Sequence, residues 1–394
     1  MIIARVKKSI QNLTFNKIFI SLFLIVYCGL YYQEYVALIA CSYALLGGAF
    51  IYNLIKHRGL IYKDFIVLCL IFVIYSFFSA LWAESFDTSY NSVIQLSKSA
   101  VVAICFITLI DSKEHFKWAL FILSLSGIIY ALLYLNHVDI SSLGANRIMA
   151  EGDFLPNVNT VGLIISFSFA YFIYMYFLDK KYVYMALAGL AFIVTFFLGS
   201  RKSIISLFIC VFLMFIKLQK TSKLKILFLL VLLIALLLFY VPIEYLNFIS
   251  ERLAQLSFWS SKMSEIDSSD ETRVRLIEYG LTYCIESPIL GHGYYSFSQL
   301  FRKDCGIILY SHNFIETFVG GGIIGFFIYY SLHGIILKRI DLRKAHFDYG
   351  YLLFVLLMIL LFNHFSIVVL QDRFVWLLLT VLFTGSIYYK YNLL

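Results

Sequence analysis

The chain has 394 residues, of which 62% are hydrophobic and only 14% are charged, and its mean hydropathy is +0.88. Soluble domains are usually about 45–50% apolar and about 25% charged, so this composition excludes a soluble globular protein and indicates a polytopic membrane protein. The net charge of +8 is therefore first a clue to membrane topology.

Apolar runs long enough to cross a bilayer recur along the whole chain. A hydrocarbon core of about 30 Å needs about 20 apolar residues in a helix, so we predict an all-α protein with about twelve transmembrane helices. The basic start before residue 17 is not followed by a small-residue cleavage site, which favours a retained first helix over a signal peptide. The predicted spans are residues 17–33, 35–55, 64–82, 93–110, 117–135, 158–178, 182–199, 203–217, 224–241, 313–332, 349–366 and 370–389.

The distribution of lysine and arginine orients these spans. With the N-terminus in the cytoplasm, the inner segments hold 20 of the 31 basic residues, the outer segments hold 10, and Lys98 lies within a span. Because basic residues collect in cytoplasmic loops, we predict that both termini lie inside. Two outer loops then follow, residues 136–157 and residues 242–311. The second loop is long enough to form a cap on a single membrane domain of residues 1–394.

The loop 242–311 and the span after it carry most of the polar chemistry. We expect a helix from Thr272 to Cys284 and a turn from Pro288 to Gly293, in which His292 is a turn residue. A second cysteine, Cys305, shares the loop with Cys284. A disulfide between them is compatible with an oxidising compartment.

His312 is the sharpest catalytic candidate, because an imidazole where a helix enters the membrane can titrate near neutral pH and act as a base. A competing interpretation is local: Asn313 is the N-cap and Glu316 completes a capping arrangement that His312 merely precedes. Glu316 is also a candidate to orient the histidine. Both interpretations stay open from the sequence alone.

Two outer cation groups are candidate anion ligands. Arg201 and Lys202 stand in a tight turn between two helices, where they either snorkel at the interface or clamp a diphosphate, whose oxygens match guanidinium forks. Arg273 and Arg275 open the loop helix, where cations oppose the helix dipole. We therefore expect at least one of them to face a ligand.

Three further basic residues have competing structural interpretations. Arg147 is either a loop charge in solvent or part of a site. Arg373 follows Asp372, so an ion pair could account for it, and Lys98 either snorkels or points into a site. The seven cysteines show no C-x-x-C spacing, so we expect no metal.

These motifs together resemble the O-antigen polymerase and O-antigen ligase superfamily, the Wzy and WaaL type. The resemblance covers most of the chain and rests on three motifs on one predicted membrane face, in order. They are Gly199-Ser-Arg-Lys-Ser203, Glu286-Ser-Pro-Ile-Leu-Gly-His-Gly293 after Arg273, and His312-Asn313 followed by Gly322-Ile-Ile-Gly325.

The resemblance implies a glycosyltransferase of the bacterial inner membrane that works on its outer face without metal or other cofactor. Donor and acceptor would be glycans on undecaprenyl diphosphate, within lipopolysaccharide or capsular polysaccharide biosynthesis. It implies that Arg201 and Arg273 hold the diphosphate and that His312 is the base. It also implies supporting roles for Arg147, Lys98 and Arg373, and a chain-length regulator as partner; nucleic acid is not expected.

We favour a repeat-unit polymerase that inverts the anomeric centre, with a ligase that transfers finished glycan to lipid A-core as the alternative. The residues eleven after Arg147 and Arg273 are Val158 and Cys284, so the R-x10-G pattern of some polymerases is missing and the ligase stays open. A flippase is a third hypothesis. It predicts charges through the middles of the spans, which carry almost no ionisable groups.

Overall fold

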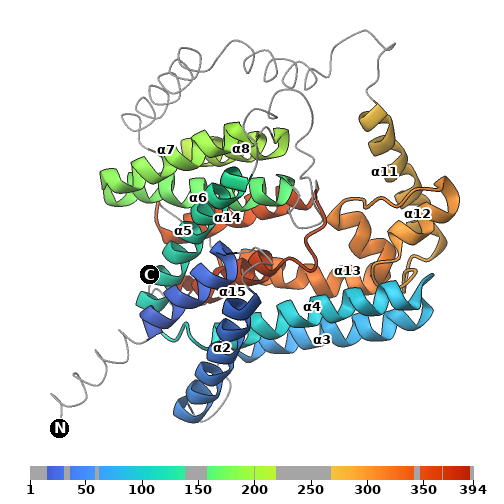
Figure 1. The fold of residues 1–394 in the computed structure, drawn as a ribbon, viewed down its shortest axis with the longest axis horizontal. Helices are drawn as coiled ribbons and strands as arrows, with labels where there is room; N and C mark the ends of the chain where they lie inside the picture. Colours follow the sequence, from blue (N-terminus) through green and yellow to red (C-terminus); the bar gives the residue numbers. More distant parts are fainter. Residues whose placement is uncertain are drawn as a thin grey trace. The chain divides into compact units, whose positions relative to one another are not determined.

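Figure 1 shows the fold in a computed structural model, which describes residues 16–30, 36–57, 62–137, 158–198, 200–218, 268–340, 347–365 and 367–390. These residues form helices joined by short connections, and no strand occurs among them. They divide into two compact units. One comprises Met1–Leu123, Ile266–Lys344 and Leu360–Leu394, and the other comprises Ser124–Glu265 and Ala345–Ile359.

The described residues are almost entirely helical, and several helices are long and apolar enough to cross a membrane, which confirms the prediction of an all-α membrane protein. The predicted span 224–241, nearly all of the first predicted outer loop (residues 138–157) and the first part of the second (residues 242–267) lie outside the described part. The count of twelve spans stays a prediction. By length and composition, six described helices can cross a membrane: Ala37–Lys56, Lys63–Trp82, Phe86–Ile107, Lys113–Asn136, Asn159–Asp179 and Asn313–Arg339.

The first unit is built around four helices, α3 (Lys63–Ser79), α4 (Phe86–Ile107), α13 (Asn313–Arg339) and α15 (Arg373–Lys390). Helix α3 packs against α4 and α13, and α15 packs against the same two helices (Figure 1). Large rings fill the space between them. The ring of Phe72 lies 5.2 Å from that of Tyr329 and 6.4 Å from that of Trp376, between centroids.

Smaller elements complete this unit. Helix α2 (Val36–His57) packs against α4 and the π-helical turn η1 (Ile25–Gly29), while the 3-10 turn η3 (Ala80–Trp82) joins α3 to α4. Helix α5 (Lys113–His137) begins here and continues into the second unit.

Side-chain caps explain where two of these helices begin. Ser85 caps α4, so this helix starts seven residues before the predicted span 93–110, and Lys98 is the thirteenth of its 22 residues. The carboxylate of Asp372 accepts the N–H of Val375 at 3.0 Å and so caps α15.

The second unit contains α6 (Val158–Asp179), α7 (Tyr182–Phe197), α8 (Arg201–Lys217) and the start of α14 (Tyr349–His364). Helix α6 packs against α7 and α8. The approach to α8 is close at Gly162, where an added Cβ would lie 1.7 Å from the hydroxyl of Ser203. Gly162 therefore lets the first turn of α8 sit directly on α6.

Candidate active site

A break in α13 organises the candidate site in the first unit. Gly322 has φ +57° and ψ −163°, a backbone conformation that is essentially restricted to glycine, and it divides α13 into a first segment, 313–321, and a second segment, 323–339. The sequence predicts a membrane span over 313–332, and a helix does occupy this range, but the structure adds a break at Gly322. The glycine run coincides with the break, but a run of glycines in a helix does not by itself predict one.

The turn Pro288–Gly293 fills this break and takes over its hydrogen bonds. The N–H groups of Ile323 and Ile324 donate to the carbonyls of Pro288 and Ile289, at 2.8 and 3.4 Å. In return, the carbonyl of Val319 accepts the N–H of His292 at 2.7 Å. An interrupted helix at membrane depth needs such partners, because an unpaired peptide group in hydrocarbon is costly.

Glycines permit the close contact between turn and helix. A Cβ at Gly322 would lie 2.2 Å from the carbonyl oxygen of Ile289, and one at Gly291, where φ is +70°, would lie 2.5 Å from the nitrogen of Gly322. Two residues of the preceding helices also bind here. Tyr75 donates its hydroxyl to the carbonyl of Gly321 at 2.7 Å, and the Trp82 indole donates to that of Gly291 at 3.2 Å.

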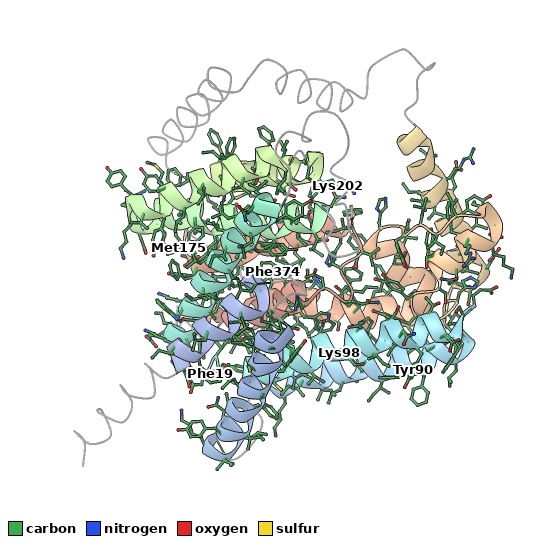
Figure 2. The ribbon with its side chains drawn as sticks, in the orientation of Figure 1. Phe19, Tyr90, Lys98, Met175, Lys202 and Phe374 are labelled. Carbon is green, nitrogen blue, oxygen red and sulfur yellow. The ribbon has the colours of Figure 1, made fainter. Side chains whose placement is uncertain are left out.

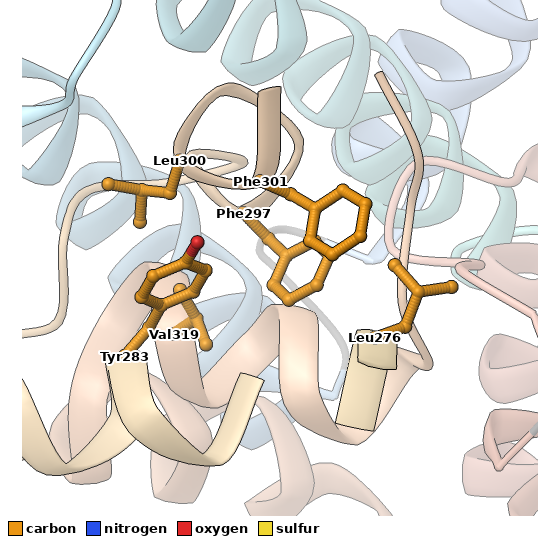
Figure 3. Packing of buried hydrophobic residues seen from close by; sticks show 6 residues of the cluster. All are labelled: Leu276, Tyr283, Phe297, Leu300, Phe301 and Val319. Carbon is orange, nitrogen blue, oxygen red and sulfur yellow. The ribbon is translucent and has the colours of Figure 1, made fainter. Parts of the chain in front are cut away.

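Two loop helices, α11 (Ser268–Glu286) and α12 (Phe297–Cys305), pack on the first segment of α13. The expected helix Thr272–Cys284 is thus present and slightly longer. Cys284 and Cys305 are free thiols beside this packing, and burial raises the pKa of Cys284 to about 11. Figure 3 shows the cluster that holds the three helices together, formed by Leu276, Tyr283, Phe297, Leu300, Phe301 and Val319.

His312 stands at the head of α13, as the N-cap residue, with φ −97° and ψ +154°. Its side chain is partly buried, and its carbonyl accepts the N–H of Glu316 at 2.8 Å. Asn313 is already inside the helix, so the capping arrangement with Asn313 as N-cap does not occur. The N-cap position belongs to His312 itself, so a cap formed by Asn313 does not account for the histidine.

Glu316 is an acidic residue with only 1% of its surface exposed. Its Oε1 accepts the N–H of Ser311 at 3.1 Å, while Oε2 has no hydrogen-bond partner among the described residues. The carboxyl group thus fixes the backbone segment just before His312. A buried carboxyl with one open oxygen is costly unless a further group binds it.

Asn313 connects three separate parts of the unit. Its Nδ2 donates to the hydroxyl of Tyr330 at 3.1 Å, and its Oδ1 accepts the N–H of Val369 at 2.9 Å. The hydroxyl of Tyr330 in turn lies 3.3 Å from Nδ1 of His364. Sequence reasoning missed Tyr330 and His364, since nothing in the local pattern around either residue signals a polar contact.

A second buried histidine adjoins this network. The rings of His333 and His364 lie 5.2 Å apart, in an edge-to-face arrangement, and both side chains are almost fully buried. Neither nitrogen of His333 has a hydrogen-bond partner within the described residues. The ring of His333 also lies 5.2 Å from that of Tyr330, so this cluster adjoins the contact between Tyr330 and Asn313.

The predicted anion ligands divide between the two units. Arg201 and Lys202 form the first turn of α8 in the second unit, where Ser200 caps the helix and bonds Asn159 of α6 at 3.2 Å; Figure 2 labels Lys202. Arg273 lies in α11 of the first unit. The side chains of Arg201 and Arg273, and the whole of Arg147, lie outside what the structure describes.

The remaining candidates belong to the first unit. Arg275 is exposed on α11, and Lys98, which Figure 2 labels, is exposed on α4. The guanidinium of Arg373 lies 4.9 Å from the ring centre of Tyr27, a cation–π contact that adds a partner besides Asp372. The structure therefore brings His312, Asn313 and Glu316 together, and leaves the grouping of the arginines as a prediction.

Comparison with known proteins adds one positive finding. Residues 185–330 match the Wzy_C family model, described as O-antigen ligase. A search of the curated proteins finds no match. The matched segment contains the Gly199–Ser203 motif, the turn Pro288–Gly293 and the start of α13 with its break. The match confirms the resemblance drawn from the motifs, in that residues 185–330 of this chain are similar to the O-antigen ligase family.

Proposed function

We propose that this protein polymerises oligosaccharide repeat units carried on undecaprenyl diphosphate, on the outer face of the bacterial inner membrane. The product would be O-antigen or capsular polysaccharide. The observation that carries the proposal is the family match, which spans all three motifs. Both termini would lie in the cytoplasm, the cap of residues 242–311 would lie outside, and a chain-length regulator would be a partner.

The proposed reaction is one direct displacement at the anomeric carbon of the donor sugar. A hydroxyl oxygen of the acceptor glycan attacks this carbon, and the bond from the carbon to the diphosphate oxygen breaks with inversion. The hydroxyl proton passes to the imidazole of His312. Because diphosphate is already a good leaving group, the protein needs only cations for the departing charge and one base, without a metal.

In this proposal Arg201 and Arg273 bind the diphosphate, and Lys202, Arg275, Arg147, Lys98 and Arg373 add to the cationic surroundings of the donor. The position of Lys98 supports its role. It is exposed near the middle of a helix long enough to span the membrane. A charged side chain is costly when it faces lipid there, so a polar partner is expected.

Asn313 and Glu316 are proposed to orient the base. The two hydrogen bonds of the Asn313 amide and the bond from Ser311 to Glu316 fix the backbone on both sides of His312. Preorganisation of this kind is what a general base requires, because a small misplacement of the reacting atoms costs much of the rate.

The second candidate function is ligation of finished glycan to lipid A-core or another acceptor. The description of the matched family model, O-antigen ligase, favours it. Both reactions use the same donor chemistry and differ only in the acceptor hydroxyl.

The surface-glycan profile of a deletion strain separates the two functions. Loss of a polymerase leaves one repeat unit on the acceptor, whereas loss of a ligase leaves none. Normal long chains in the deletion strain would exclude both. Reconstitution in liposomes adds a control, since lengthening of lipid-linked glycan without translocation excludes a flippase.

A further inference from the structure

Helix α11 has three faces, of which one is buried, one is polar and exposed, and one is apolar and exposed. Its buried face carries Leu276, Gly280 and Tyr283 and packs on α12 and α13. A second face is polar and exposed, with Arg275, Glu278, Thr282 and Glu286. The third face, which we call the α11 apolar stripe, consists of Val274, Ile277, Leu281 and Ile285, with 55, 39, 56 and 78% of their surfaces exposed.

The α11 apolar stripe continues across the inserted turn onto α13. Ile289 and Leu290 of the turn are 61 and 48% exposed, and the backbone of Ile289 is bonded to Ile324. On the second segment of α13, Ile324 and Phe327 are 38 and 64% exposed. Exposed apolar residues therefore continue from the loop helix through the turn to the second segment of α13.

Residues further along α11 contact residues further along α13, so the two helices lie side by side and run in the same direction. The stripe therefore lies alongside α13. Gly280 of α11 lies against the side chain of Ile315, and Tyr283 shares the cluster with Val319. Pro288, just after α11, bonds Ile323. The last turns of α11 thus accompany the first segment of α13 as far as its break.

We infer that the α11 apolar stripe lies against the acyl chains of the bilayer, so that α11 is a membrane-interface helix and not a fully solvated part of the cap. Contiguous exposed apolar patches normally mark an interaction surface. A helix with an apolar face next to a charged face is the arrangement of helices that lie in the interface plane. Continuity with the exposed face of α13 identifies the partner as lipid.

This arrangement has a consequence for the polar face of α11. With the stripe in hydrocarbon, Arg275 and Glu278 lie at headgroup level. The inference does not rest on the proposed reaction, since it concerns only contact with bilayer lipid.

Photocrosslinking tests the inference directly. The full chain carries p-benzoylphenylalanine in place of Leu281 and is reconstituted in vesicles of phosphatidylethanolamine and phosphatidylglycerol. Thr282, the adjacent residue on the polar face, is the matched control, and Phe327 on α13 is the positive control. After irradiation we expect a lipid adduct by mass spectrometry at positions 281 and 327, and at least tenfold less at 282. Equal lipid adduct at 281 and 282, or protein crosslinks at 281, would overturn the inference.

Aqueous labelling gives an independent measurement. In a cysteine-free background, Leu281→Cys and Thr282→Cys are treated with a membrane-impermeant maleimide in intact membranes. Thr282→Cys should react at least tenfold faster. Equal rates would show that water reaches the stripe and would contradict lipid contact.

Discussion

The side-chain amide of Asn313 donates a hydrogen bond of 3.1 Å to the hydroxyl of Tyr330, although the two residues are 17 positions apart in the same helix. In a straight α-helix that separation is about 25 Å along the axis, far beyond the reach of the two side chains. The contact exists because Gly322 breaks α13 and the two segments fold back on each other. Phe314 stacks on Tyr330 at 4.8 Å between ring centres in the same fold-back. The start of α13, where His312 stands, is thereby held by the second segment of the same helix.

Tyr330→Phe tests this clamp. The variant removes the acceptor of the Asn313 amide and the contact with His364 while keeping the ring, so we expect a loss of about 1–3 kcal/mol in stability. Thermal unfolding in detergent measures it. Tyr90→Phe, at an exposed position, is the control and should unfold like the wild type.

Gly322→Ala should prevent the native packing of α13. The added Cβ would lie 2.2 Å from the Ile289 carbonyl oxygen, at a φ of +57° that other residues rarely adopt. Gly334→Ala, in the same helix but with open space around it, should be neutral or slightly stabilising. Size-exclusion profiles and yields of folded protein compare the two, and equal behaviour would contradict the observed break.

His312→Ala should abolish polymer while the protein still inserts in the membrane. A general base contributes about 10²–10⁴-fold to a rate, so glycan lengthening by purified protein should fall by that range. Wild-type chain length in this variant would refute the proposed role of the histidine.

Arg273→Ala should also stop polymerisation, because it removes a cation proposed to bind the diphosphate. Loss of one group that stabilises developing negative charge typically costs about 10²–10³-fold. Arg302→Ala, on the exposed part of α12, is the matched control with the same change in net charge. A similar loss in both variants would point to a general charge effect and not to a site.

Asp111→Asn should destabilise the first unit in a pH-dependent way. Burial alone raises the pKa of Asp111, but the hydrogen bond from His115 at 2.6 Å and the charge of Lys56 outweigh it, so its pKa in the folded protein lies below the usual 3.8. A group with a lowered folded-state pKa contributes stability above its unfolded value and loses it as the pH falls through the folded value.

The melting temperature of Asp111→Asn should therefore be lower than that of wild type near neutral pH, by an effect on the order of 1 kcal/mol, and the difference should vanish as the pH falls below 3.8. Asp64→Asn is the control. This substitution removes an ion pair with Arg339. Asp64 is exposed, however, and exposed ion pairs contribute little to the free energy of unfolding.

Several features of this protein are predictable from local sequence. Composition identifies the membrane class, and helices occupy the apolar runs of the described chain because a bilayer leaves few alternatives for an apolar backbone. The turn at Pro288–Gly293 also follows from its residues, since Gly291 and Gly293 adopt positive φ there. The family motifs are equally local, and the match over residues 185–330 agrees with them.

Other features depend on contacts between distant segments. The alternative in which Asn313 caps the helix fails because its amide is occupied by Tyr330 and Val369, which the pattern around residue 313 does not reveal. The contact of His364 with the Tyr330 hydroxyl likewise joins distant segments, so the sequence around residue 364 does not predict it.

The sequence by itself determined a membrane-embedded helical protein with the motifs of a glycan-transferring superfamily. Only the tertiary structure decided that the helix after His312 is interrupted and that a turn from the preceding loop completes it. The physical reason is that hydrophobic periodicity is identical for a straight and a broken helix. The choice depends on which carbonyls accept the N–H groups of Ile323 and Ile324, and here they belong to Pro288 and Ile289.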